Sequence, residues 1–240
     1  MAERSIDITM IADVTCPWCV IGYRNLRQAL HRLPASITLR LHWEGHELNP
    51  ELEANGCNLL QHIEQKYAAN PAEVQAIWER ITALGARTGF PFCYTADTRT
   101  YNTHRCHLAV GWAGGFGQAT AFMEALFESY FIHKQNPGQR DTLLSIARRL
   151  GLDPVHLTAA LDDPSRSEHQ RTLQQDNEAH GILAVPVFRI GQQPPVIGAE
   201  PVETLESTLR RELTAGTRFP HTQQAGSDGT GTISCKQAPD

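Results

Sequence analysis

The sequence predicts an α/β fold in which a long run of helices interrupts a strand-containing frame. Three observations in this chain of 240 residues lead to the prediction. Residues 5–45 read strand, helix, strand; residues 58–180 carry helical patterns almost throughout; and residues 184–213 return to strand, strand, helix. The two outer segments therefore form one α/β unit, and the middle segment is an insertion into it.

The amino-terminal segment predicts a βαβ unit. Residues 5–14 are rich in Ile and Val, which favours a mostly buried strand. From Pro17 onward, apolar residues recur every three or four positions as far as Leu33, the pattern of an amphipathic helix, and Pro34 ends it. Apolar side chains then alternate along residues 36–45, so a second strand is expected there.

The middle segment contains several helices with recognisable ends. Pro71 is expected to open a helix that ends near Gly89, and Asp153 is expected to cap another that starts at Pro154. Gly181 should end the last helix of the insertion. Two short strands, at 184–190 and 196–199, and an amphipathic helix at 201–213 complete the pattern.

These patterns divide the chain into three parts. Residues 5–48 and 181–213 form one domain, and residues 49–180 form an all-helical insertion. After Leu213 the sequence is rich in Gly, Thr and Gln with little apolar content, so residues 214–240 are expected to be a flexible tail that carries Cys235.

Composition excludes several classes of function. With 41% hydrophobic and 20% charged residues the chain can bury a core, and its net charge of −5 argues against a nucleic-acid partner. No run of apolar residues is long enough to span a membrane, so no membrane association is expected. The amino terminus lacks the pattern of a secretory signal, which predicts a cytoplasmic protein.

The short sequence Cys16-Pro17-Trp18-Cys19 carries the chemistry. The pair can be a redox centre, half of a metal site or two buried thiols, but no second cysteine pair is visible, so no metal site is predicted. At the start of a helix, unpaired backbone N–H groups favour a thiolate at Cys16. Cys19 lies one turn inside the helix. We therefore predict that Cys16 attacks a disulfide and that Cys19 resolves the product.

This arrangement resembles the thioredoxin superfamily. The strand–CPWC–helix opening, the helical insertion and the return through GILAVPVF and VIGAEPVETLESTLR are similar to its DsbA-like branch, and most closely to FrnE-type oxidoreductases. Supporting matches are WEGHELNP, YNTHRCHLAVGWA and LFESYFIH. The resemblance covers residues 5–213 and implies a thioredoxin fold with a large helical insertion.

The resemblance also implies further site residues. Pro186, with Val185 before it, takes the place of the cis-proline that faces the cysteine pair and binds substrate. The stretch around His104 is expected near the active-site face, and Asn49 after the second strand is expected to line the same cleft. Pro17 and Trp18 form the active-site loop.

Two positions depart from the family pattern. Trp18 stands where the periplasmic oxidant of this branch has a histidine, which predicts a more reducing couple. Met10 stands where thioredoxins have a buried acid that aids proton transfer to the resolving thiol. Glu44 and Asp13 are the nearest acids by sequence, and Asp13 lies three residues before Cys16. It can hydrogen-bond the loop, or it can be an ordinary turn carboxylate.

The function predicted from these features is a thiol:disulfide oxidoreductase, a disulfide reductase or isomerase. It needs no bound cofactor, takes electrons from glutathione or another thiol, acts on protein or small-molecule disulfides, and is a monomer or homodimer. One alternative is a glutathione-dependent isomerase or transferase of the kappa-class type, which usually has serine at the first active-site position. A second alternative is a redox-regulated chaperone or a metal carrier that uses Cys16 and Cys19.

Overall fold

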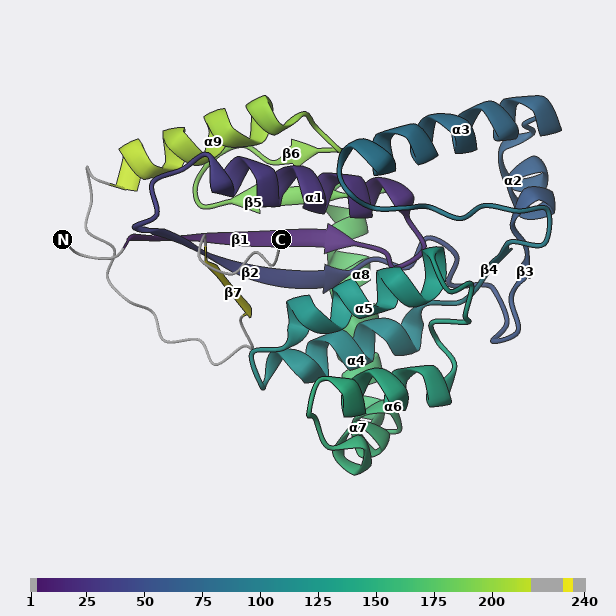
Figure 1. Cartoon of the computed structure of the whole chain (residues 1–240). Helices are drawn as coiled ribbons and strands as arrows, with labels where there is room; N and C mark the ends of the chain where they lie inside the picture. Colours follow the sequence, from purple (N-terminus) through teal and green to yellow (C-terminus); the bar gives the residue numbers. More distant parts are fainter. Residues whose placement is uncertain (1–3, 217–230, 235–240) are drawn as a thin grey trace.

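The computed structural model describes residues 4–216 and 231–234. Its main sheet has the strand order β6-β5-β1-β2-β7 (Figure 1). The strands are β1 (Arg4–Ala12), β2 (Ile37–Gly45), β5 (Val187–Ile190), β6 (Val196–Ile197) and β7 (Gly231–Ser234). β1 and β2 run parallel, whereas β5 pairs antiparallel with β1. The amino-terminal and carboxyl-terminal segments therefore share one sheet, as the sequence predicts.

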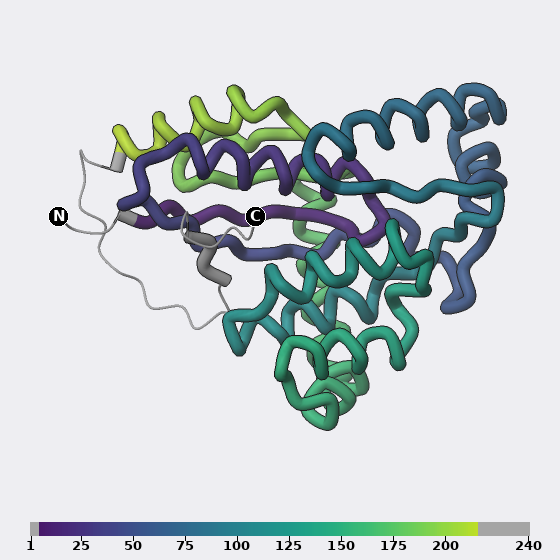
Figure 2. The backbone as a smooth tube through the Cα atoms, in the orientation of Figure 1, coloured from purple at the N-terminus to yellow at the C-terminus, as the bar shows by residue number. Residues whose placement is uncertain are grey.

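One face of the sheet forms the core of this unit. Helices α1 (Pro17–His31) and α9 (Val202–Gly216) lie side by side over it (Figures 1 and 2). The strand positions Ile6, Ile8 and Met10 pair with Leu39, Leu41 and Trp43 in the parallel register. All of them except the half-buried Trp43 are buried, because alternate side chains of a strand point to the same face.

The opposite face of the sheet is polar where α8 (Pro164–Ala179) does not cover it. Asp7 pairs with Arg40 and Thr9 with His42 along β1 and β2. α8 covers the carboxyl-terminal end of β2, where the Gln170 side chain donates a hydrogen bond of 2.9 Å to the Gly45 carbonyl. This end of the sheet is also where the cysteine pair follows β1.

Most of the insertion is helical, with boundaries that match the predicted caps. Its helices are α2 (Leu59–Tyr67), α3 (Pro71–Arg87), α4 (His104–Gly114), α5 (Ala119–Phe131), α6 (Arg140–Arg149), α7 (Pro154–Leu161) and α8. Asn70 and Glu73 form a capping box at the start of α3, and Asp153 accepts a hydrogen bond from the Val155 N–H at the start of α7.

The prediction of an all-helical insertion is wrong in one place. β3 (Cys57–Asn58) and β4 (Arg99–Thr100) form a two-stranded antiparallel sheet beside α2. In Figure 1 this small sheet lies with α2 and α3 beyond the carboxyl-terminal end of β1. The strands have two residues each, too short to leave an alternating pattern in the sequence.

The tail prediction is also wrong in part. α9 continues past Leu213 to Gly216, and residues 231–234 form β7, which pairs antiparallel with β2. Without β7, strand β2 would have an unpaired edge on this side of the sheet, and β7 supplies the hydrogen-bond partners for that edge. Cys235 lies outside the described residues.

Candidate active site

Cys16 stands at the junction between β1 and α1. It is the N-cap residue of α1, with extended backbone angles (φ −88°, ψ 111°), and Pro17 occupies the first helical turn. Proline suits that turn because its missing N–H would lack a helical partner there anyway. The Cys16 sulfur therefore sits at the positive end of the helix, where a negative charge is stabilised.

Both cysteines are buried, and Cys19 is the more deeply buried of the two. Cys16 is 4% exposed and Cys19 is 0% exposed, and both are free thiols. Burial raises the pKa of the Cys19 thiol well above its usual value, and the neighbouring Cys16 raises it further. This asymmetry fits the predicted roles, in which Cys16 meets the substrate and Cys19 acts second.

Pro186 faces the cysteine pair. The Val185–Pro186 peptide bond is cis, as expected from the resemblance. The Cys16 thiol lies 3.6 Å from the Val185 carbonyl oxygen, to which it donates. Gly22, one turn beyond Cys19, leaves room for this approach, because a Cβ there would stand 3.1 Å from the Pro186 ring. The fold thus brings together two motifs that are far apart in the sequence.

One side chain of the insertion contacts the cysteine loop, and two aromatic rings of the insertion stack on each other. The Arg80 guanidinium of α3 lies 5.6 Å from the centre of the half-buried Trp18 ring. Tyr94 stacks on Trp78 with 5.1 Å between ring centres. Burial raises the pKa of the Tyr94 hydroxyl, with smaller contributions from Tyr130 and Cys16. Sequence reasoning missed Tyr94 because no local motif marks it.

Asp13 is a buried carboxylate beside the loop. It accepts hydrogen bonds from the Thr15 N–H (3.2 Å), the contact of a turn carboxylate, and from the Leu48 N–H (2.7 Å). Burial works to raise the pKa of Asp13, but the His107 imidazole and these two N–H groups together hold it below its usual value. Asp13 therefore ties the cysteine loop to the segment that follows β2.

The family model of the DSBA-like thioredoxin domain matches residues 7–210. The chain belongs to the DsbA-like thioredoxin family. That match spans both halves of the sheet and the whole insertion, and the family is one of thiol oxidoreductases, which act on disulfide substrates.

Solved structures show the same fold. SCO1869 of Streptomyces coelicolor, a probable DsbA oxidoreductase, is 23% identical, with a TM-score of 0.79 over 94% of this chain and 98% of its own. A 2-hydroxychromene-2-carboxylate isomerase is 14% identical, with a TM-score of 0.66 over 88% and 98%. DsbM of Pseudomonas aeruginosa, a cytosolic disulfide reductase, is 16% identical, with a TM-score of 0.58 over 87% and 99%.

In this DsbA-like protein, the side chains of His104 and Asn49 bond to other protein groups. His104 contacts Glu47 (2.6 Å) through Nδ1 and Ser167 (2.7 Å) through Nε2. Within residues 4–216, neither His104 nor Asn49 has a hydrogen bond to Cys16 or Cys19. Their role in substrate binding stays a prediction.

Asn49→Ala is expected to lower the free energy of unfolding by about 1–3 kcal/mol. The Asn49 side chain contacts His62 Nε2 at 2.8 Å and accepts from Lys66 Nζ at 2.7 Å, so its loss leaves two polar groups of α2 without this partner. Urea unfolding of the reduced protein measures the change. Unaltered stability together with a raised KM for a disulfide would instead assign Asn49 to substrate binding.

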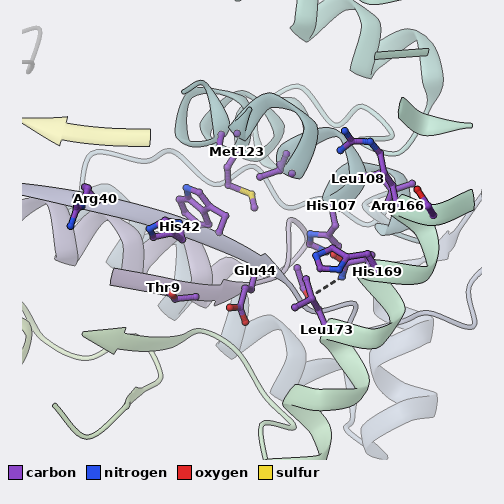
Figure 3. Close-up of a pocket in the computed structure, with 18 of the residues that line it drawn as sticks. Thr9, Arg40, His42, Glu44, His107, Leu108, Met123, Arg166, His169 and Leu173 are labelled. Atoms are coloured by element: carbon purple, nitrogen blue, oxygen red, sulfur yellow. Dashed lines mark hydrogen bonds between the residues drawn. The ribbon is translucent and has the colours of Figure 1, made fainter. Parts of the chain in front are cut away.

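A cavity of about 960 Å³ lies on the polar face of the sheet (Figure 3). Its walls come from β1, β2, α4, α5 and α8, and include Thr9, His42, His107, Arg166 and His169. The two cysteines of the loop are not among its lining residues. The cavity is therefore separate from the surface at which Cys16 and Pro186 meet.

Across the ranges 4–216 and 231–234, no helix is sufficiently long and apolar to cross a membrane. In the same residues, no three His, Cys, Asp or Glu side chains are grouped closely enough to hold a metal ion.

Proposed function

We propose that this protein is a disulfide reductase that exchanges disulfides through Cys16 and Cys19. The observation that carries the proposal is the position of Cys16, at the start of α1 and 3.6 Å from the carbonyl oxygen before the cis-proline. A thiolate there is stabilised by the helix end, and a disulfide laid along Val185 and Pro186 would reach it.

The reaction proceeds in two displacements. The Cys16 thiolate attacks one sulfur of the substrate disulfide, which breaks the substrate S–S bond, releases one thiol and forms a mixed disulfide. Cys19 then loses its proton and attacks Cys16. This step forms the Cys16–Cys19 disulfide and releases the second thiol. The substrate gains two electrons, and two molecules of glutathione or another thiol restore the reduced pair.

The surroundings of the pair favour reduction as the direction of exchange. Trp18 cannot carry a positive charge before Cys19, so it adds no charge that would stabilise the reduced, thiolate form and make the couple oxidising. DsbM, whose fold is similar, is a cytosolic disulfide reductase and has a structure with GSH. We therefore infer a reductase in the cytoplasm that takes electrons from glutathione and acts on protein or small-molecule disulfides, as a monomer or homodimer.

The redox equilibrium against glutathione tests this proposal. We expect a reversible two-electron transition with a midpoint near about −250 mV or lower, read by Trp18 fluorescence and by thiol alkylation. Trp18→Phe is the control that assigns the fluorescence change to Trp18. In the wild-type protein, alkylation should give the same midpoint as fluorescence. A midpoint near about −150 mV or higher would assign the protein to oxidation or isomerisation instead.

The fold is also similar to that of a 2-hydroxychromene-2-carboxylate isomerase, so we test the rival hypothesis of a glutathione-dependent isomerase or transferase. That hypothesis requires a glutathione-dependent activity that survives without the cysteine pair. Cys16→Ser and Cys19→Ala are therefore assayed for transferase and isomerase activity. If both variants retained this activity, the isomerase or transferase hypothesis would replace the reductase proposal.

A further inference from the structure

Three side chains away from the cysteine pair form a hydrogen-bonded row. Glu47 lies two residues after β2, His104 is the first residue of α4, and Ser167 is the fourth residue of α8. Glu47 Oε1 lies 2.6 Å from His104 Nδ1, and Ser167 Oγ lies 2.7 Å from His104 Nε2. Since 57 positions separate the first two residues and 63 the last two, only the fold brings this row together.

The chemistry of the three groups sets the direction of both hydrogen bonds. A carboxylate only accepts, so His104 Nδ1 donates its hydrogen to Glu47. The other nitrogen of a neutral imidazole then carries no hydrogen, so His104 Nε2 accepts the hydroxyl hydrogen of Ser167. The row thus places a base against a hydroxyl group, and the carboxylate holds the imidazole in the tautomer that this base requires.

Other contacts hold the main chain around the row. Helix α8 packs against α4 and against β2 (Figure 1). The Glu47 N–H donates to the Gln174 side-chain oxygen at 2.8 Å, which ties Glu47 to the helix that carries Ser167. The His104 N–H donates to the Asn102 side-chain oxygen at 3.0 Å, at the start of α4. The three side chains therefore project from a main chain that is fixed by its neighbours, as a catalytic arrangement requires.

The acid is the most buried member of the row. The Glu47 side chain is 7% exposed and the His104 side chain 20%, while Ser167 is half-buried. A molecule from solvent can therefore meet Ser167, while the shielded carboxylate interacts strongly with a positive charge on the imidazole. Ser167 also lies near the amino-terminal end of a helix of 16 residues, and this positive end favours a negative charge that develops beside the hydroxyl.

We propose that Ser167, His104 and Glu47 form a second catalytic site, which hydrolyses a carboxylic ester. Ser167 Oγ attacks the carbonyl carbon of the ester while His104 Nε2 takes the hydroxyl proton. The bond from this carbon to the alcohol oxygen then breaks, the alcohol leaves with the proton from His104, and the acyl group stays on Ser167. A water molecule gives a proton to His104 and attacks the acyl carbon. The bond to Ser167 Oγ breaks, the hydroxyl regains its proton and the acid is released.

The three residues have different roles in this reaction. Ser167 and His104 touch the reacting atoms, so they are its catalytic residues. Glu47 is a positioning residue, because it acts through the tautomer of His104 and through the charge on the imidazolium that forms. The substrate class is an ester rather than an amide, because an alcohol is a better leaving group than an amine. The cysteine pair takes no part, so this inference does not rest on the proposed function.

Hydrolysis of p-nitrophenyl acetate tests the site, in protein whose accessible thiols are first alkylated so that they do not react with the ester. Ser167→Ala and His104→Gln are each expected to lower the rate by about 100-fold, because the nucleophile or its base is lost. Glu47→Gln should lower kcat by at least about 10-fold with little change in KM, since the ester does not touch Glu47. Glu47→Asp keeps the charge and should recover part of that loss.

A matched control and a covalent label make the result specific. Ser165 lies on the same helix, but its hydroxyl donates to the Asp163 carboxylate at 2.7 Å instead of to a histidine, so Ser165→Ala should leave the rate unchanged. A fluorophosphonate should form a P–O bond with Ser167 and release fluoride, and peptide mass spectrometry locates the adduct. His104→Gln should abolish this adduct. Ser167→Ala changes one half-buried helix side chain, so the test does not depend on the folding of the histidine variant.

An adduct on Ser167 that depends on His104, together with the loss of ester hydrolysis in Ser167→Ala, is the result that supports the second site. If the fluorophosphonate left Ser167 unlabelled, or if Ser167→Ala hydrolysed the ester as fast as Ser165→Ala, the proposal would be overturned and the row would only join α4 to α8. Neither result bears on disulfide exchange, which the redox equilibrium of Cys16 and Cys19 tests separately.

Discussion

Cys16→Ser is expected to reduce disulfide exchange to the uncatalysed background. A serine hydroxyl at the start of α1 cannot supply the thiolate that attacks a disulfide, even though the helix end stabilises negative charge there. Cys19 cannot replace it, because its sulfur is completely buried and its pKa is raised by burial. The reduction of a labelled peptide disulfide by glutathione is the measurement.

Cys19→Ser is expected to behave differently from Cys16→Ser. It should release a single thiol and then stop as a mixed disulfide on Cys16, which mass spectrometry of the intact protein detects as an adduct. Cys93→Ser is the matched control, since this thiol is exposed and belongs to the loop before β4. If Cys19→Ser turned over at the wild-type rate, a second glutathione would be resolving the mixed disulfide, and Cys19 would not be needed.

The sequence is sufficient to predict the frame that places Cys16. Ile residues and alternating apolar positions identify β1 and β2, while Pro17 marks the first turn of α1. These signals are local, so they survive without knowledge of the tertiary structure. Only the family resemblance predicts the cis bond before Pro186, because no local pattern distinguishes it from a trans bond.

The site beyond the cysteine pair depends on contacts that no local pattern records. Asp13 directly follows β1 and His107 lies on α4, and their side chains meet because Gly45 leaves space for the imidazole ring. His104 contacts Glu47 and Ser167 through its two ring nitrogens, and no local pattern in the sequence indicates either partner. Single histidines and carboxylates are common in any sequence. Only the packing of α4 against β2 and α8 shows which of them contact one another.

The packing behind the cis-proline strand leads to the largest expected effect on stability. Phe188 is completely buried in β5, where it pairs with Met10 on one side and Val196 on the other. Its ring also reaches α1, because a Cβ on Gly22 would lie 3.1 Å from Phe188 Cζ. One side chain thus connects the strand that follows Pro186 with the helix that carries Cys19.

Phe188→Ala is therefore expected to lower the free energy of unfolding by about 3–5 kcal/mol, through lost burial and the cavity left behind. Phe188→Leu should restore most of that loss, since it refills much of the volume. Phe116→Ala is the control: this ring is 52% exposed after α4, so its loss should cost less than about 1 kcal/mol. Urea unfolding of the reduced proteins measures all three. A loss below 1 kcal/mol for Phe188→Ala would mean that β5 and α1 are not packed through this ring, and that Pro186 is positioned by the backbone pairing of β5 with β1 alone.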